Sequence, residues 1–248
     1  MANVIAHRGA NASAPQNTIA SFKRAVLLGC DGFENDVHLT KDGVVVVCHN
    51  YTIDETSNGK GYIKDMTFEQ LRSYDFGSYF GEQYAGEKIP TLEEFLDVAQ
   101  AVRIINIEVK NPPDGNMELV SKTLAQVKNA GLEDRLIISS FSDDVLKEVK
   151  RLNADIPTGL LYDPMSDKIE EIFEDPFGFA LNIGCSAIHP VFLYCEDDYI
   201  EQAHNNGLIV NAWTCNTERV INALLDAGCD GLITDVPDLA SKIIAERE

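Results

Sequence analysis

The chain has 248 residues, 45% of them hydrophobic, and a formal net charge of −20 at pH 7. This charge disfavours extended contact with nucleic acid or with an anionic bilayer. No apolar run is long enough for a membrane helix and the first residues lack the features of a signal peptide, so we expect a soluble, cytoplasmic protein without stable membrane association. A monomer and a homodimer are both compatible with these properties, and the length suits one barrel or two small domains.

Short β-branched runs alternate with longer amphipathic stretches, which is the pattern of a parallel sheet wrapped by helices. Strands are predicted at Val4–His7, Gly32–His38, Arg103–Val109, Leu136–Ser140, Thr158–Leu161, Ala187–His189, Ile209–Trp213 and Gly231–Thr234. Helices are predicted at Thr18–Leu28, Thr91–Val102, Met117–Ala130, Asp143–Leu152, Asp167–Glu174, Asp197–Asn206, Thr217–Ala227 and Pro237–Glu246. This alternation predicts an α/β protein, a TIM (β/α)8 barrel that forms a single domain over residues 1–248.

Residues 39–88 depart from this alternation. The Thr-Lys-Asp-Gly sequence of residues 40–43 is a turn signal, so Val44–Cys48 is predicted to pair back on the second strand as a hairpin. Residues 51–88 then form a long excursion, and a connection of this length inside a domain is typical of a lid or a specificity element. We therefore predict a small insertion, residues 51–88, after the second strand.

Acidic residues lie at the predicted ends of two neighbouring strands. Glu34 and Asp36 are two residues apart on one strand and point to the same face, and Glu108 ends the next parallel strand. Three carboxylates in a partly dry site repel one another unless a cation neutralises them. An all-oxygen ligand set suits one divalent cation, Mg²⁺ or Ca²⁺, with Mn²⁺ also possible. The alternative interpretation is a structural ion network with Arg8 and Lys110.

Basic residues and histidines flank these acids in the sequence. Arg8 and Lys110 beside a metal would form an anion site suited to a phosphate. His7 and His49, each at the end of a predicted strand, could supply one general acid and one general base near neutral pH. The sequence therefore predicts transfer of a phosphoryl group between two oxygens. Trp213 could wall a substrate pocket or pack in the core.

The other three histidines are weaker candidates. We interpret His38 as a surface residue beside the turn, with the rim of the pocket as the alternative. His189 is expected to end a strand, where it could also line the site, and His204 is expected to be solvated.

The motifs that carry these residues resemble those of the glycerophosphodiester phosphodiesterase family. The resemblance covers nearly the whole chain and rests on Ala6-His7-Arg8-Gly9, Ala14-Pro15-Gln16-Asn17-Thr18, Glu34-x-Asp36-Val37-x-x-Thr40-x-Asp42-Gly43, Val47-x-His49, Ile89-Pro90-Thr91-Leu92, Ile107-Glu108-x-Lys110, Ala212-Trp213-Thr214 and Ile233-Thr234-Asp235. It implies a TIM barrel with an insertion after the second strand.

The resemblance also implies roles for the candidate residues. Glu34, Asp36 and Glu108 would be the metal ligands, and His7 and His49 would be the general acid–base pair. Arg8 and Lys110 would bind the phosphate, and Trp213 would contact the carbon atoms of glycerol. The implied reaction is metal-dependent hydrolysis of a small-molecule glycerophosphodiester to an alcohol and glycerol 3-phosphate, through a cyclic phosphate that water opens.

Two positions depart from the pattern of the family. Gln16 and Asn50 each replace a carboxylate with an amide. Neither position is assigned to the metal or to proton transfer, so we expect activity to be retained. Because it withdraws a nearby anion, Asn50 is expected to lower the pKa of His49.

Two other functions remain open. The first is a lysophospholipase D, or a hydrolase of another phosphodiester, on the same barrel. Aromatic residues of the insertion could supply the apolar groove that such an enzyme needs, although packing of the insertion onto the barrel is the favoured interpretation for Tyr62, Phe68, Phe76, Tyr79, Phe80 and Tyr84. The second is a noncatalytic binding module, which is disfavoured because none of the proposed catalytic residues is lost.

Overall fold

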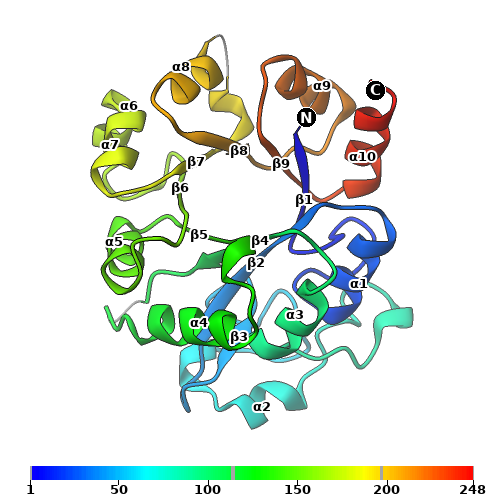
Figure 1. Cartoon of the computed structure of the whole chain (residues 1–248). Coiled ribbons are helices and arrows are strands. Elements are labelled where there is room, and N and C mark those ends of the chain that lie inside the picture. Colours follow the sequence, from blue (N-terminus) through cyan, green and yellow to red (C-terminus); the bar gives the residue numbers. More distant parts are fainter. Residues whose placement is uncertain (1, 113–114, 196–197, 248) are drawn as a thin grey trace.

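Eight parallel strands close into a barrel in the computed structural model, which describes residues 2–112, 115–195 and 198–247 (Figure 1). The barrel strands are β1 (Asn3–His7), β2 (Gly32–Leu39), β4 (Ile104–Val109), β5 (Leu136–Ser140), β6 (Thr158–Tyr162), β7 (Ala187–Pro190), β8 (Ile209–Ala212) and β9 (Gly231–Thr234). Each strand pairs in parallel with its neighbours, and the pairing of β1 with β2 closes the ring. The predicted TIM barrel is confirmed.

Helices surround the barrel, and several begin at a capping residue that the sequence shows. The helices that flank the barrel strands are α1 (Ile19–Leu27), α3 (Leu92–Ala99), α4 (Glu118–Asn129), α5 (Asp143–Leu152), α6 (Ile169–Glu174), α7 (Pro176–Asn182), α8 (Tyr199–Asn205), α9 (Glu218–Asp226) and α10 (Pro237–Ala245). The side chains of Thr18, Thr91, Ser142 and Thr217 accept backbone hydrogen bonds at the starts of α1, α3, α5 and α9. The N-terminal end of the predicted helix at Asp197 lies outside the described residues.

A short strand, β3 (Val45–Val47), pairs antiparallel with β2, as the turn signal predicts. The chain then runs through η1 (Ile63–Asp65), α2 (Phe68–Ser73) and η2 (Glu82–Tyr84) before α3 begins. In Figure 1, α2 lies outside the ring, beyond β3. This excursion has a buried cluster of its own, formed by Val46, Cys48, Ile53, Ile63, Leu71, Phe76 and Ile89.

Two larger apolar clusters fill the space between the strands and the helices. One of them contains Phe22, Phe33 and Phe95, whose rings pack at centroid distances of 4.7–6.0 Å. The other joins β6–β9 to α7–α10. These clusters anchor the strands, so the carboxyl ends of the strands form a rigid rim. No helix among the described residues has both the length and the apolar character needed to cross a membrane.

Candidate active site

The register of the barrel brings the three predicted metal ligands together. Asp36 on β2 lies directly opposite Glu108 on β4, and Glu34 lies opposite His7 on β1. One oxygen from each of Glu34, Asp36 and Glu108 lies within 4.8 Å of the others, and all three residues are buried. The convergence predicted from the strand ends is therefore observed.

The electrostatics of this cluster show unbalanced negative charge. Burial, followed by the carboxylates of Asp36 and Glu108, raises the pKa of Glu34 well above its usual range. Burial also raises the pKa of Glu108 to about 7. Burial opposes ionisation of Asp36 too, but Lys110 and Arg8 outweigh it and hold the pKa of that carboxyl well below its usual range. Two cations therefore face three carboxylates.

Arg8 and Lys110 contact the cluster directly. Nε of Arg8 lies 3.5 Å from a carboxylate oxygen of Asp36, and the ammonium of Lys110 lies 2.7 Å from the other and also bonds Glu108. Arg8 donates a hydrogen bond from Nη1 to Gln16 at 2.7 Å. The amide of Gln16 thus accepts a hydrogen bond from the guanidinium of Arg8 without neutralising the positive charge of Arg8, which stays available to an anion.

An all-oxygen donor set with an excess negative charge fits a hard divalent cation. Glu34, Asp36 and Glu108 would supply its ligands, and oxygen ligands are those that Mg²⁺ and Ca²⁺ prefer. The ion network with Arg8 and Lys110 is also present, but its two positive charges do not neutralise the cluster. A cation would supply the missing charge.

His7 is oriented by a carboxylate that the sequence argument did not assign to catalysis. Nδ1 of His7 lies 2.6 Å from Asp235, which directly follows β9 and also accepts hydrogen bonds from Asn11 and Asn216. Burial opposes ionisation of Asp235, but these bonds lower its pKa, so the ionised carboxylate accepts a hydrogen bond from the N–H at Nδ1 of His7. Nε2 of His7 is then the atom available to exchange a proton. Burial is the largest influence on the pKa of His7 and lowers it.

His49, by contrast, is oriented by an amide. Nδ1 of His49 lies 2.6 Å from Oδ1 of Asn50, and Nδ2 of Asn50 donates to the exposed carboxylate of Glu55 at 2.8 Å. Because a carboxylate only accepts, this bond fixes the orientation of the amide and places the proton of the neutral His49 ring on Nδ1. The pKa of His49 is lowered to about 4, and burial is the largest cause, whereas the hydrogen bond to Asn50 acts in the opposite direction and raises it.

The two histidines line one cavity of about 320 Å³ at the mouth of the barrel. Trp213 lies at the end of β8, where its indole donates to the carbonyl of His189 at 2.7 Å and its ring meets Phe141 edge-on at 5.7 Å. The further residues that line the cavity are Arg8, Glu34, Asn106, Glu108, Leu161, Asp163 and Ile233. Two imidazoles, two carboxylates of the acidic cluster and an aromatic wall therefore face the same space.

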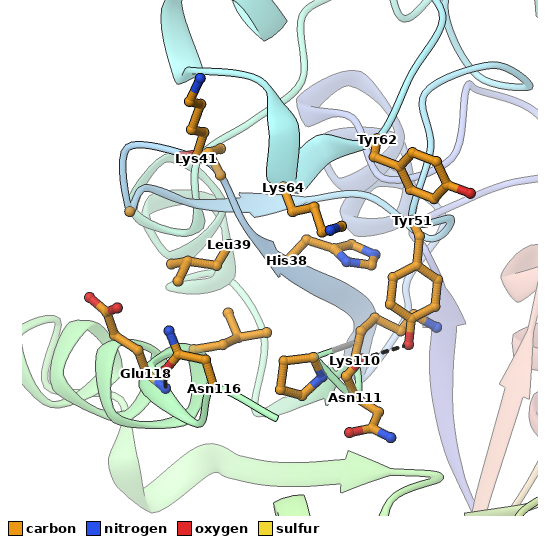
Figure 2. Close-up of a pocket in the computed structure, with 14 residues that line it drawn as sticks. His38, Leu39, Lys41, Tyr51, Tyr62, Lys64, Lys110, Asn111, Asn116 and Glu118 are labelled. Atoms are coloured by element: carbon orange, nitrogen blue, oxygen red, sulfur yellow. Dashed lines mark hydrogen bonds between the residues drawn. The ribbon is translucent and has the colours of Figure 1, made fainter. Parts of the chain in front are cut away.

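The structure corrects the interpretation of His38 as a surface residue. His38 is 5% exposed, and its Nε2 hydrogen-bonds the backbone carbonyl of His49 at 3.1 Å. It lines a neighbouring cavity of about 240 Å³ beside Tyr51 and Lys64, so the alternative position at the rim of the site is closer to what is observed (Figure 2). Tyr51, at the start of the excursion, packs edge-on against the ring of His38 at a centroid distance of 5.0 Å.

The remaining two histidines do not line the cavity that His7 and His49 share. His189 is fully buried inside the barrel, where Asn211 contacts its Nε2 at 2.9 Å. His204 is partly exposed and contacts Asp230 at 2.8 Å.

Comparison with known proteins decides the family. The model of the glycerophosphoryl diester phosphodiesterase family matches residues 7–239. The chain belongs to the glycerophosphoryl diester phosphodiesterase family. It is 38% identical to the glycerophosphodiester phosphodiesterase of Caldanaerobacter subterraneus over 97% of both chains, and 33% identical to that of Bacillus subtilis over 96% of this chain and 85% of the relative.

Solved structures of the same family share the fold. A phosphodiesterase of Oleispira antarctica, in complex with the product sn-glycerol-3-phosphate, is 28% identical and aligns with a TM-score of 0.89 over 98% of this chain and 96% of its own. The enzyme from Parabacteroides distasonis is 30% identical, with a TM-score of 0.80 over 99% and 98% of the two chains. As a member of this family, the chain is a phosphoric diester hydrolase, and the predicted family and enzyme class are confirmed.

The excursion of this phosphodiesterase packs mainly on itself and on the loops of the barrel. Phe76 is 4% exposed within the buried cluster, and the hydroxyl of Tyr84 donates to the carbonyl of Ser13 at 2.7 Å. The hydroxyl of Tyr79 accepts from the backbone of Gln16. These contacts favour packing as the role of Phe76, Tyr79 and Tyr84, whereas Tyr62 is 53% exposed.

Proposed function

We propose that this chain hydrolyses glycerophosphodiesters to an alcohol and glycerol 3-phosphate, in a reaction that depends on a divalent cation. The observation that carries the proposal is the shared cavity, because His7 and His49 face it together with Glu34 and Glu108. The product complex of the relative from Oleispira antarctica supports the choice of glycerol 3-phosphate.

Substrate binding would use the cations and the aromatic wall of the cavity. The guanidinium of Arg8 and the ammonium of Lys110 would bind the oxygens of the phosphate. The indole of Trp213, held by its bond to the carbonyl of His189, would contact the carbon atoms of glycerol. When bound to Glu34, Asp36 and Glu108, the cation would offset the negative charge that grows on the phosphoryl oxygens.

The two histidines would exchange protons in two steps. In the first step, one imidazole removes the proton from the glycerol hydroxyl next to the phosphate, and that oxygen attacks phosphorus. The other histidine gives its proton to the departing alcohol, so that a cyclic phosphate remains. In the second step the roles reverse, and water opens the ring to give glycerol 3-phosphate. Asp235 and Asn50 keep the Nδ1 atoms of His7 and His49 protonated and leave Nε2 to react.

Turnover of glycerophosphocholine by the purified chain tests the proposal. Glycerol 3-phosphate is measured with a coupled dehydrogenase, and choline with an oxidase. We expect both products in equal amounts, and a loss of at least about 10²-fold in kcat for His7→Ala and for His49→Ala, which is the size expected for removal of a proton-transfer group. Undiminished turnover by either variant would refute the two-histidine mechanism.

Lysophosphatidylcholine serves as the competing substrate. Because Phe76 is buried and the hydroxyls of Tyr79 and Tyr84 are bonded to the loop of residues 13–16, we expect its kcat/KM to be at least about tenfold below that of glycerophosphocholine. Equal values would favour a lysophospholipase D instead.

A further inference from the structure

A second cavity, which we call the headgroup cavity, adjoins the active site. It has a volume of about 290 Å³ and shares Glu108, Phe141 and Asp163 with the cavity that contains the two histidines. Tyr51, Lys110, Met165 and Ser166 also line it. A substrate whose phosphate lies at Glu108 could therefore extend one of its two alcohol groups into this space.

The carboxylate of Asp163 gives one wall of the headgroup cavity a negative charge. Oδ1 of Asp163 accepts hydrogen bonds from the backbone of Met165 at 2.8 Å and from the hydroxyl of Ser166 at 3.2 Å. These bonds fix the carboxylate in place, while no lysine, arginine or histidine among the described residues pairs with it. The cation of the cavity, Lys110, already contacts Asp36 and Glu108.

Aromatic rings form the other walls. The hydroxyl of Tyr51 donates to the carbonyl of Asn111 at 2.8 Å, which holds the ring between the headgroup cavity and the pocket drawn in Figure 2. The ring of Phe141 packs edge-on against the indole of Trp213, which fixes its position. The faces of aromatic rings attract an ammonium group through their quadrupole, and a fixed carboxylate adds a direct charge interaction.

We propose that the headgroup cavity selects a leaving alcohol that carries a positively charged amine, and that Asp163 determines this selectivity. The proposal rests on the proposed function, since it assigns the alcohol that departs from the glycerophosphodiester. A quaternary or primary ammonium would lie between Tyr51 and Phe141 and face Asp163. An alcohol with a carboxylate or a further phosphate would be repelled by the same side chain. The alcohol departs as before, with its oxygen protonated by a histidine while its bond to phosphorus breaks.

The test uses two substrates that differ in the charge of the leaving alcohol. Glycerophosphocholine is compared with the glycerophosphodiester of 3,3-dimethylbutanol, in which carbon replaces the quaternary nitrogen. We expect the wild-type kcat/KM to favour the choline ester by about tenfold, and Asp163→Asn to remove most of this preference. The asparagine keeps Oδ1 and therefore the bonds to Met165 and Ser166.

A ratio of two substrates for the same variant does not depend on how much of the protein is folded. Asp97→Asn removes one negative charge from the exposed surface of α3 and should keep the wild-type ratio of the two kcat/KM values. It therefore controls for the effect of net charge on the electrostatic field of the whole protein. A ratio that Asp163→Asn leaves unchanged would overturn the inference while leaving the proposed function intact. Failure to hydrolyse either substrate would instead refute the proposed function.

Discussion

Nδ1 of His49 lies 2.6 Å from the side-chain oxygen of Asn50, whereas Nδ1 of His7 lies 2.6 Å from a carboxylate, that of Asp235. The two proton-transfer candidates therefore have the same geometry but different electrostatic partners. Both partners orient the imidazole, but the neutral amide of Asn50 stabilises the charged form of the ring less than a carboxylate does.

The Asn50→Asp variant tests this asymmetry. A carboxylate at position 50 would stabilise the imidazolium, so the pKa of His49 should rise from its lowered value of about 4. We expect the limb of the kcat/KM against pH profile that belongs to His49 to move to higher pH by about one unit. Glu55→Gln is the matched control, because it removes the more distant charge and should move that limb slightly to lower pH. An unshifted profile for Asn50→Asp would contradict the assignment of His49 to proton transfer.

The Asp235→Asn variant tests the orientation of His7. An amide in this place can donate a hydrogen bond to Nδ1, which would favour the wrong tautomer and move the proton to Nε2. We expect kcat to fall by at least about 10²-fold, with little change in KM. Asp226→Asn, which alters the exposed ion pair with Arg247, should retain wild-type kcat. Equal losses for both variants would indicate a general effect on the fold.

The Glu34→Gln variant should stabilise the cation-free protein while it weakens cation binding. Burial and two neighbouring carboxylates raise the pKa of Glu34, so its charged form destabilises the folded state. In a chelator, we expect the melting temperature to rise by about 2–4 °C, which corresponds to about 1 kcal/mol for a chain of this size.

Adding Mg²⁺, Ca²⁺ or Mn²⁺ gives the second half of this experiment. The wild-type protein should melt at a higher temperature when the cation is present, because binding favours the folded state. Glu34→Gln should lose most of this increase, and the exposed variant Asp97→Asn should keep it. A wild-type melting temperature that no cation raises would count against a metal site at these carboxylates.

His189 should make stability depend on pH. Burial lowers its pKa to about 3, so in the range between this value and the ordinary 6.5 the unfolded chain binds the proton and the folded chain does not. The free energy of unfolding should therefore fall as the pH falls through this range, by about 2 kcal/mol between pH 7 and pH 5 from this residue alone. Denaturant titration of the wild type and of His189→Gln measures the difference. An equal fall for both proteins would show that His189 is not the cause.

The sequence predicted the barrel and the core of the site because both depend on local rules. Asp36 and Glu108 converge because residues near the carboxyl ends of adjacent parallel strands meet in register. The same rule could have assigned Asp235, which directly follows β9. The short helix α2 also had a visible signal, the capping box formed by Thr67 and Gln70.

Other features depend on tertiary contacts and leave no local signal. The burial of His38 follows from the position of Tyr51 in the excursion, which sequence spacing does not give. The contact of Glu55 with Asn50 and the approach of Asp163 to the active site are set by loop conformations. The helix α7 is short and mostly apolar, so its pattern does not separate it from a connecting segment.

Turnover of glycerophosphocholine by the metal-stripped protein tests the central claim most directly, with Mg²⁺, Ca²⁺ and Mn²⁺ added back one at a time. Release of glycerol 3-phosphate should be absent after stripping and should return with at least one of the three ions. Full activity in the stripped protein, verified as metal-free by mass spectrometry, would contradict the claim that Glu34, Asp36 and Glu108 hold a catalytic cation.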